Sequence, residues 1–296
     1  MAALGTAEAR AAIKTRVVNG AVRVQNRVGR AGIADGTGTI VSMSPRFRYT
    51  MLFRLMEYRS EQMAFDGERA ATSFLPNGNP TSLGGFLKGQ SMPLKEGLIC
   101  GVLSAAWPLL RLDQVQPKLD YRGLNKIEGR ELHELSYRQR KGHSDLKATL
   151  YFDSATFRHV RSTYRFEIPA QLGVGPNDST RLSEGYYLVV EDFDDFRAVD
   201  GLTLPHMYRL QLNVSTSTGS QLTDWTLHVS SVSHKEAFDD RMFKLVSAAT
   251  VNREVAALLD LDGSLDPWRP RLQVEGRIQG TRPRMSAGRI EDGCSY

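Results

Sequence analysis

Apolar and polar residues alternate along most of the chain, which is the pattern of β-strands with one buried face. In the clearest case, Phe47, Tyr49, Met51 and Phe53 share one face of the segment 46–55. The same pattern predicts strands over 14–28, 46–55, 61–66, 68–75, 118–126, 130–139, 145–152, 157–168, 184–196, 204–214 and 223–234. Long strands with one apolar face predict a wide antiparallel sheet that has one solvated face and that twists and curls.

Turn residues separate these strands, and a predicted helix cap precedes the first of them. Thr6 is placed to cap a short helix within residues 6–14. Asp-Gly and Glu-Gly pairs predict tight turns at Glu128-Gly129 and Asp200-Gly201. The glycines of the segment 35–38 predict a further turn there.

One segment departs from the alternation of the strands. It lies between Pro93 and Pro108, and its apolar residues Leu94, Leu98 and Val102 follow a spacing of four. That spacing predicts a buried helix of about four turns over 93–107, with Pro93 at its first position. A single helix covers only part of the apolar face of a wide sheet, so the pattern predicts either a cavity or a core closed by loops.

The composition excludes several classes of protein. The chain has 296 residues, of which 41% are hydrophobic and 24% charged, and no apolar run is long enough for a transmembrane helix. Two cysteines, Cys100 and Cys294, make neither a disulfide framework nor a clustered zinc site. The net charge of +5 comes from residues 1–30, and residues 31–296 carry no net charge. The body of the protein therefore lacks the excess of basic residues that a nucleic-acid-binding surface requires. The basic first strand is either a solvated face or a contact for acidic lipids or an acidic partner.

The sequence offers few candidates for chemistry. The six histidines lack the i,i+2 or i,i+4 spacing of a metal site. Glu191, Asp192, Asp194 and Asp195 are interpreted as a solvated acidic turn at a strand end rather than as a pair for acid–base work. The thiol of Cys100 falls within the predicted apolar helix, and no nucleophile or phosphate-binding motif is present. We therefore expect no catalytic residue, metal or cofactor.

Two segments resemble the bacterial outer-membrane lipoprotein carriers (the LolA/LolB-like family). The first is a strand, an Asp-led turn and a strand over 150–161, and the second is the run over 190–205 that continues into a strand through Leu212. With the predicted helix, the resemblance covers roughly 15–245. It implies a mainly β fold, an open and incomplete antiparallel β-barrel of about ten or eleven strands around a central apolar helix.

The resemblance also implies a function, namely non-enzymatic carriage of a lipid, a lipoprotein acyl chain or another apolar ligand in the periplasm. A membrane-anchored donor or acceptor protein would be a partner. The alternative is a regulatory sensor on the same fold, which binds a lipidated signal and a protein. The expected lining comes from the apolar stripes, although the same residues would equally form a closed core: Phe47, Tyr49, Met51, Phe53, Leu94, Leu98, Val102, Val160, Tyr164, Tyr208, Leu210, Leu212, Trp225 and Leu227.

Two features depart from that family. The sequence shows no signal peptide after Met1, so we expect the natural start to lie upstream if the protein is exported. The family also uses an arginine in the cavity to control opening, and the pattern assigns none. We predict one LolA/LolB-like domain over 1–246 and a peripheral tail over 247–296, with a short helix and then disordered sequence.

Overall fold

A computed structural model describes residues 2–28, 32–75, 77–171, 183–216, 219–234, 237–245, 250–254 and 256. In this part of the chain, twelve strands form one antiparallel sheet in the order β5-β4-β3-β2-β1-β12-β11-β10-β9-β8-β7-β6. Its strands are β1 (Thr15–Val28), β2 (Gly32–Met43), β3 (Arg46–Phe53), β4 (Ser60–Phe65), β5 (Ala70–Thr72), β6 (Lys118–Ile127), β7 (Arg130–Arg138), β8 (Lys147–Asp153), β9 (His159–Gln171), β10 (Ser183–Val199), β11 (Leu202–Thr216) and β12 (Gly219–Ser233).

The sheet consists of two runs of sequential strands that meet at one seam. β1 to β5 form one run, β6 to β12 form the other, and β1 pairs with β12 through partners such as Val18 and Val232. The strand order ends at β5 on one side and at β6 on the other, so the sheet is an open β-barrel. This confirms the predicted fold class, with twelve strands in place of ten or eleven.

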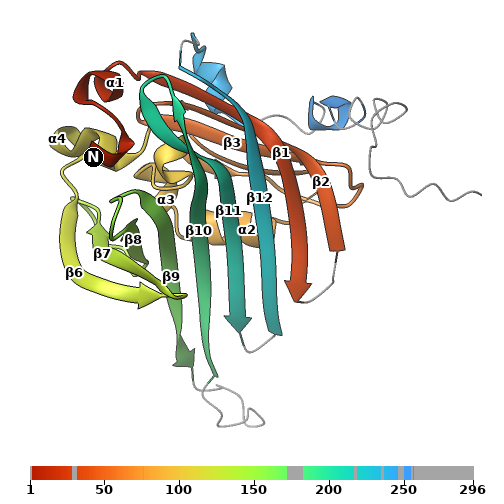
Figure 1. The fold of residues 1–296 in the computed structure, drawn as a ribbon. Helices are drawn as coiled ribbons and strands as arrows, with labels where there is room; N and C mark the ends of the chain where they lie inside the picture. Colours follow the sequence, from red (N-terminus) through yellow and green to blue (C-terminus); the bar gives the residue numbers. More distant parts are fainter. Residues whose placement is uncertain are drawn as a thin grey trace, which may run out of the picture. The chain divides into compact units, whose positions relative to one another are not determined.

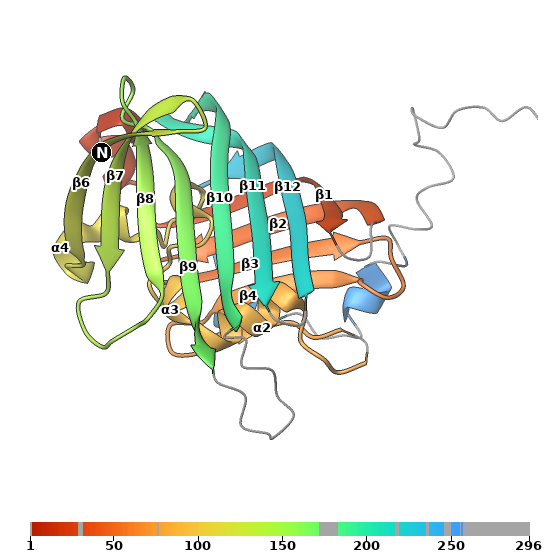
Figure 2. The ribbon, with the colours of Figure 1, turned by 90° about the horizontal axis from the view of Figure 1, so that it is seen from below.

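The sheet curls until its two runs face each other. Figure 2 shows β2, β3 and β4 crossing behind β10, β11 and β12, and Figure 1 shows β3 passing behind β12. The rings of Tyr49 on β3 and Tyr208 on β11 lie 6.0 Å apart across the interior. The apolar residues of both runs therefore point into one shared core.

Short helices lie in the connections, and those between β5 and β6 cover the concave face (Figure 2). The helical elements are η1 (Ala2–Leu4), α1 (Ala7–Ala11), α2 (Ser82–Gly89), α3 (Met92–Lys95), η2 (Gly101–Leu103), η3 (Pro108–Arg111), α4 (Leu112–Val115) and η4 (Asp240–Phe243). The predicted cap is confirmed, because the Thr6 hydroxyl accepts a hydrogen bond from the Ala9 N–H at the start of α1.

The prediction of one helix over 93–107 is wrong. α3 ends at Lys95, and Gly97 adopts a φ of 70°. The Leu98 N–H donates to the Pro93 carbonyl (2.8 Å) and the Gly97 N–H to the Leu94 carbonyl (3.1 Å), which is a Schellman cap. A positive φ at Cys100 then keeps the segment irregular up to η2. The segment is nevertheless buried, as its apolar residues require.

The predicted turn at 35–38 is also wrong, because these residues lie inside β2. The glycines there serve close packing between strands. A Cβ on Gly36 would lie 1.8 Å from the Leu52 carbonyl oxygen of β3. Strand β2 was missed because its Gly and Asp residues hide the alternation that the rest of the sheet shows.

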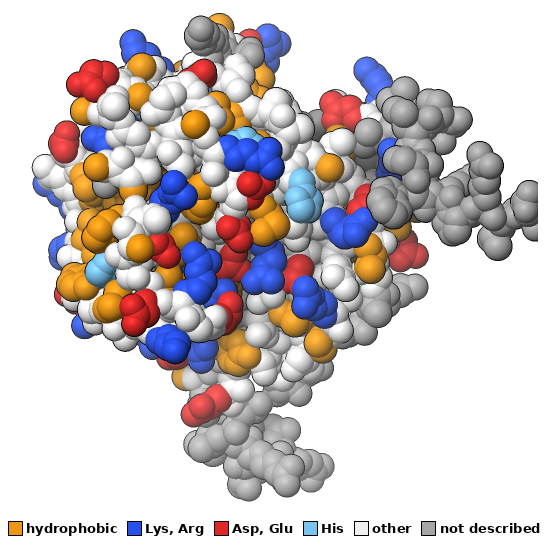
Figure 3. Space-filling view, viewed as in Figure 1, with side chains coloured by type: hydrophobic (Ala, Val, Ile, Leu, Met, Phe, Trp, Pro, Cys, Tyr) orange, Lys and Arg blue, Asp and Glu red, His pale blue; other side chains and the backbone are white. Residues whose placement is uncertain are grey.

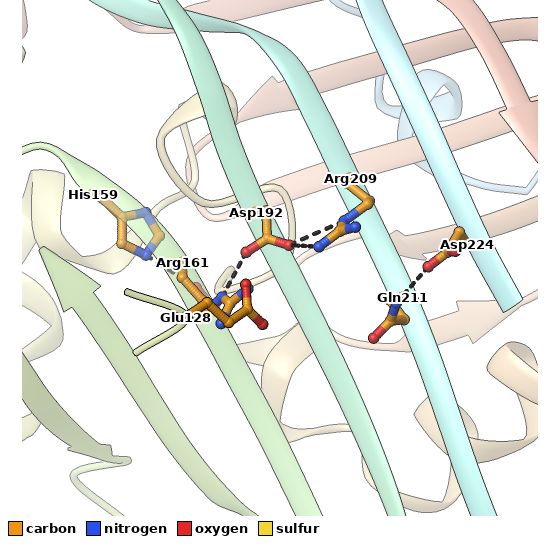
Figure 4. Close-up of polar contacts among 8 residues, drawn as sticks. Glu128, His159, Arg161, Asp192, Arg209, Gln211 and Asp224 are labelled. Atoms are coloured by element: carbon orange, nitrogen blue, oxygen red, sulfur yellow. Dashed lines mark hydrogen bonds and ion pairs between the residues drawn. The ribbon is translucent and has the colours of Figure 1, made fainter. Parts of the chain in front are cut away.

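Charged side chains lie on the outer face of the same strands (Figure 3). Arg161 on β9 and Arg209 on β11 both pair with Asp192 on β10, and Arg161 also reaches Glu128 (Figure 4). The shortest N···O distances in these pairs are 2.5 to 2.7 Å. These ion pairs tie three strands together on the solvent side, opposite the apolar core.

The chain divides into two units, Met1–Asp260 and Leu261–Tyr296. Residues 250–254 and 256 are helical, within the tail where a short helix is predicted. The predicted domain border at 246 and the predicted disordered part of the tail lie outside the described residues, so both stay predictions. Among the described residues, the helices are too short to cross a membrane.

The Schellman cap generates a prediction about stability. Gly97→Ala forces a side chain into a positive φ and places its Cβ 2.5 Å from the Ala106 carbonyl oxygen. We expect it to lower the free energy of unfolding by about 1–3 kcal/mol in urea titrations. The matched change Gly89→Ala at the end of α2 meets open space, so it should leave stability unchanged or raise it by up to about 1 kcal/mol. Equal effects of the two variants on the free energy of unfolding would contradict the assignment of Gly97 as the residue that ends α3.

Candidate functional site

One cavity lies on the concave side, between the start of α2 and the ends of β1, β2 and β12. Its volume is about 620 Å³, within the usual range of small-molecule sites. The lining mixes apolar side chains with a smaller set of polar ones: Val24, Asn26, Gly32, Ile33, Ala34, Leu55, Met56, Glu57, Tyr58, Glu61, Leu75, Asn77, Thr81, Ser82, Leu83, Gln221, Thr223 and Trp225.

The apolar lining continues to the surface at the mouth of this cavity. Ile33, Leu55 and Met56 line the cavity and are 59%, 41% and 70% exposed. Large apolar side chains grouped at a surface opening are typical of sites that meet a ligand, a membrane or another protein. We call these three residues the apolar rim.

A buried carboxylate forms part of the cavity wall. Glu61 of β4 accepts hydrogen bonds from the hydroxyls of Tyr58 and Thr81, both at 2.7 Å. The Trp225 indole N–H donates to the Tyr58 oxygen at 2.9 Å, which links the two sides of the curled sheet. The Thr81 oxygen also accepts the Gly84 N–H at 2.8 Å and thereby caps α2. Burial raises the pKa of Glu61 to about 7, against the opposite effect of the two hydroxyls.

A second cavity of about 420 Å³ lies on the other side of α2. It shares Thr81, Ser82 and Gln221 with the larger cavity. Phe86 of α2 stacks on Tyr187 of β10 along its wall, with ring centroids 5.5 Å apart. The helix α2 therefore stands between two neighbouring spaces under the same sheet.

The fourteen residues predicted from the apolar stripes all lie in the protein interior. Each is at most 4% exposed. Trp225 lines the larger cavity, and Val102 lines a small space of about 30 Å³. The other twelve are buried but do not line these spaces: Phe47, Tyr49, Met51, Phe53, Leu94, Leu98, Val160, Tyr164, Tyr208, Leu210, Leu212 and Leu227. Their contact with a ligand stays a prediction.

The interpretation of Glu191 as part of a solvated acidic turn is wrong. Glu191 lies in the middle of β10, fully buried on the inner face. It accepts hydrogen bonds from the hydroxyls of Tyr164 (2.7 Å) and Tyr208 (2.6 Å) and from the Cys100 N–H (2.7 Å). Burial raises the pKa of Glu191 to about 7 and raises the pKa of the nearby Cys100 thiol. The carboxylate thus holds the irregular segment after α3 against the sheet.

Arg16 is an exception on the basic first strand, whose Arg23 and Arg27 side chains are 59% and 49% exposed. Its side chain is fully buried, and it donates through Nη1 to the Val102 carbonyl and through Nε to His234 Nε2 (3.0 Å). The other ring nitrogen of His234 lies 2.9 Å from Asp200. Burial lowers the pKa of Arg16 to about 10. The alternation of residues assigned no arginine to the interior, whereas the structure places Arg16 there.

The described residues include no group of three or more His, Cys, Asp or Glu side chains that would hold a metal ion. His159 is buried between aromatic rings, 4.9 Å from Trp107 and 4.7 Å from Phe193 by ring centroids. Burial lowers its pKa to about 3, so its imidazole is neutral and serves the packing of this end of the core.

No protein-family model and no curated protein matches the chain. The structure is similar to that of a LolA superfamily protein from Nitrosomonas europaea, with 11% identity and a TM-score of 0.41 over 82% of this chain and 98% of that chain. A DUF1329 family protein from Desulfovibrio piger matches with 12% identity and a TM-score of 0.38, over 82% and 95%.

An outer membrane lipoprotein-sorting protein domain from Vibrio parahaemolyticus matches with 9% identity and a TM-score of 0.35, over 84% of this chain and 94% of that chain. Two of these three structures carry the name of the group that the sequence resembles.

The buried Glu191 predicts a pH-dependent stability. Its pKa is about 7 in the folded protein, against 4.5 for the unperturbed group, so the folded state binds its proton more tightly. This stabilisation is complete below about pH 4.5 and is lost as the pH rises through 7. The unfolding free energy of the wild type minus that of Glu191→Gln should fall by on the order of 3 kcal/mol between pH 4.5 and 7.5.

Urea titrations at four pH values measure this difference. Glu61 and His159 also titrate, but their contributions are common to both proteins and cancel in it. Parallel pH profiles of the two proteins would contradict the burial of this carboxylate.

Proposed function

We propose that the protein binds and carries an apolar ligand, such as a lipid or a lipoprotein acyl chain, in the larger of the two cavities beside α2. The observation that carries the proposal is a 620 Å³ space with a mainly apolar lining on the concave face of an open sheet. The role is carriage without catalysis. The resemblance of segments 150–161 and 190–205 to lipoprotein carriers supports a place in the bacterial cell envelope.

The burial of an acyl chain in such a space supplies enough free energy for binding. Each methylene removed from water contributes ~0.8 kcal/mol, so a chain of about fourteen carbons contributes roughly 10 kcal/mol before ordering costs. The curled sheet supplies the walls, and α2 with its preceding loop supplies the floor. The site is therefore formed by elements that the fold already holds in place.

The apolar rim supports transfer as well as storage. Ile33, Leu55 and Met56 leave apolar surface at the mouth, where a chain enters or leaves. A membrane surface or a membrane-anchored protein that donates or accepts the ligand would cover this surface during exchange.

A first experiment is native mass spectrometry of the purified protein, followed by organic extraction and lipid analysis. We expect an apolar molecule in a stoichiometric amount on the folded protein. A protein that carries none, and that takes up none from added tetradecanoyl lipids, would contradict the proposal.

A substitution that fills the cavity tests its place. Ala34 lies on the inner face of β2 and lines the cavity, so Ala34→Trp should occupy part of the space. We expect affinity for a tetradecanoyl lipid to fall at least tenfold. Thr37→Trp places the same side chain on the exposed outer face of β2 and should leave affinity unchanged. If both folded variants bind like the wild type, the ligand lies elsewhere.

A further inference from the structure

The hydrogen bonds around Glu61 leave acceptors, and not donors, at this point of the cavity wall. The hydroxyls of Tyr58 and Thr81 each donate their single hydrogen to Glu61. The Trp225 N–H donates to the Tyr58 oxygen. Each Glu61 oxygen accepts one of these bonds, and a carboxylate oxygen has a second lone pair. A ligand atom at this position therefore meets unused lone pairs.

The charge of the lining points the same way. The described residues around the cavity include two carboxylates, Glu57 at the exposed end and Glu61 at the buried end, and no lysine, arginine or histidine. A buried anion is stabilised by a donor or a cation and destabilised by a second anion. A carboxylate or phosphate group next to Glu61 would meet a like charge, and none of the described lining residues carries a positive charge to compensate it.

We infer that the ligand places next to Glu61 a group that donates a hydrogen bond and carries no negative charge, such as an amine, an amide or a hydroxyl. This inference rests on the proposed function and specifies its ligand class. The apolar chain fills the remaining space towards the rim, and any phosphate or carboxylate of the ligand stays outside the buried end.

The test compares three ligands with the same fourteen-carbon chain: tetradecylamine, monotetradecanoylglycerol and tetradecanoate. Binding is measured by calorimetry below the micelle concentrations, at pH 8.5. Glu61 is ionised at that pH, because burial raises its pKa only to about 7. We expect the amine and the glycerol ester to bind at least tenfold more tightly than tetradecanoate.

Two variants assign the preference to this residue. Glu61→Gln retains the shape of the side chain but removes its charge and replaces one of its two acceptor oxygens by an NH2 donor, so we expect the amine's advantage over tetradecanoate to fall at least tenfold. Glu131→Gln makes the same change of charge at an exposed site on β7, outside the cavity lining, and should leave the three affinities as they are.

The outcomes separate the inference from the proposed function. Tight binding of tetradecanoate to the wild type, or an unchanged preference in Glu61→Gln, would overturn the inference while carriage of apolar chains still stands. Failure of all three ligands to bind would overturn the proposed function itself. The expected order of affinities, lost only in Glu61→Gln, supports both.

Discussion

One constraint governs this protein: most of the long strands bury their apolar side chains on the same side of a sheet that does not close on itself. The connection between β5 and β6 is the main stretch available to cover that face from within. It does so with short helices and irregular turns rather than with one long helix. Such a cover fits the sheet closely in one region and leaves open space in another. The cavity beside α2 is thus a direct result of the mismatch between a wide sheet and a short cover.

Buried charged residues fix this cover in position. Three strands of the sheet each supply one charged side chain, and each reaches a different part of the cover. Glu61 on β4 holds the cap of α2, Glu191 on β10 holds the Cys100 N–H, and Arg16 on β1 holds the Val102 carbonyl. Polar groups inside a core require such partners, so these contacts define where the cover sits as well as stabilising it. The buried end of the cavity is lined by one of them, Glu61, so the position of the cover and the proposed selection of the ligand depend on the same residue.

The alternation of residues predicted most of the strands, and the resemblance predicted the open barrel, because both depend on local sequence. The charged residues of the interior were not predicted, because charged side chains are usually exposed to solvent. Residues two apart in a strand lie on the same face. Arg16 therefore shares the inner face with Val18, and Glu191 shares it with Val189 and Phe193, so the alternation already places both side chains inside. Glu61 shares the inner face with Met63 in the same way. The end of α3 is a local feature, because Gly97 takes the positive φ of a helix C-cap. The cavity depends on contacts between distant segments, which a single sequence does not reveal.

The seam between β1 and β12 bears on how the protein folds. Each run of strands grows by hairpins between neighbours, whereas the seam joins residues from near the two ends of the described chain, such as Val18 and Val232. Closing so long a loop costs entropy before any contact is gained, so the seam is expected to form late and to slow folding. The first strand, which carries Arg16, stays without its β12 partner until the last strand has been synthesised. The chain therefore remains incompletely folded through most of its synthesis, and its ligand cavity, with β1 and β12 in its wall, is among the last features to appear.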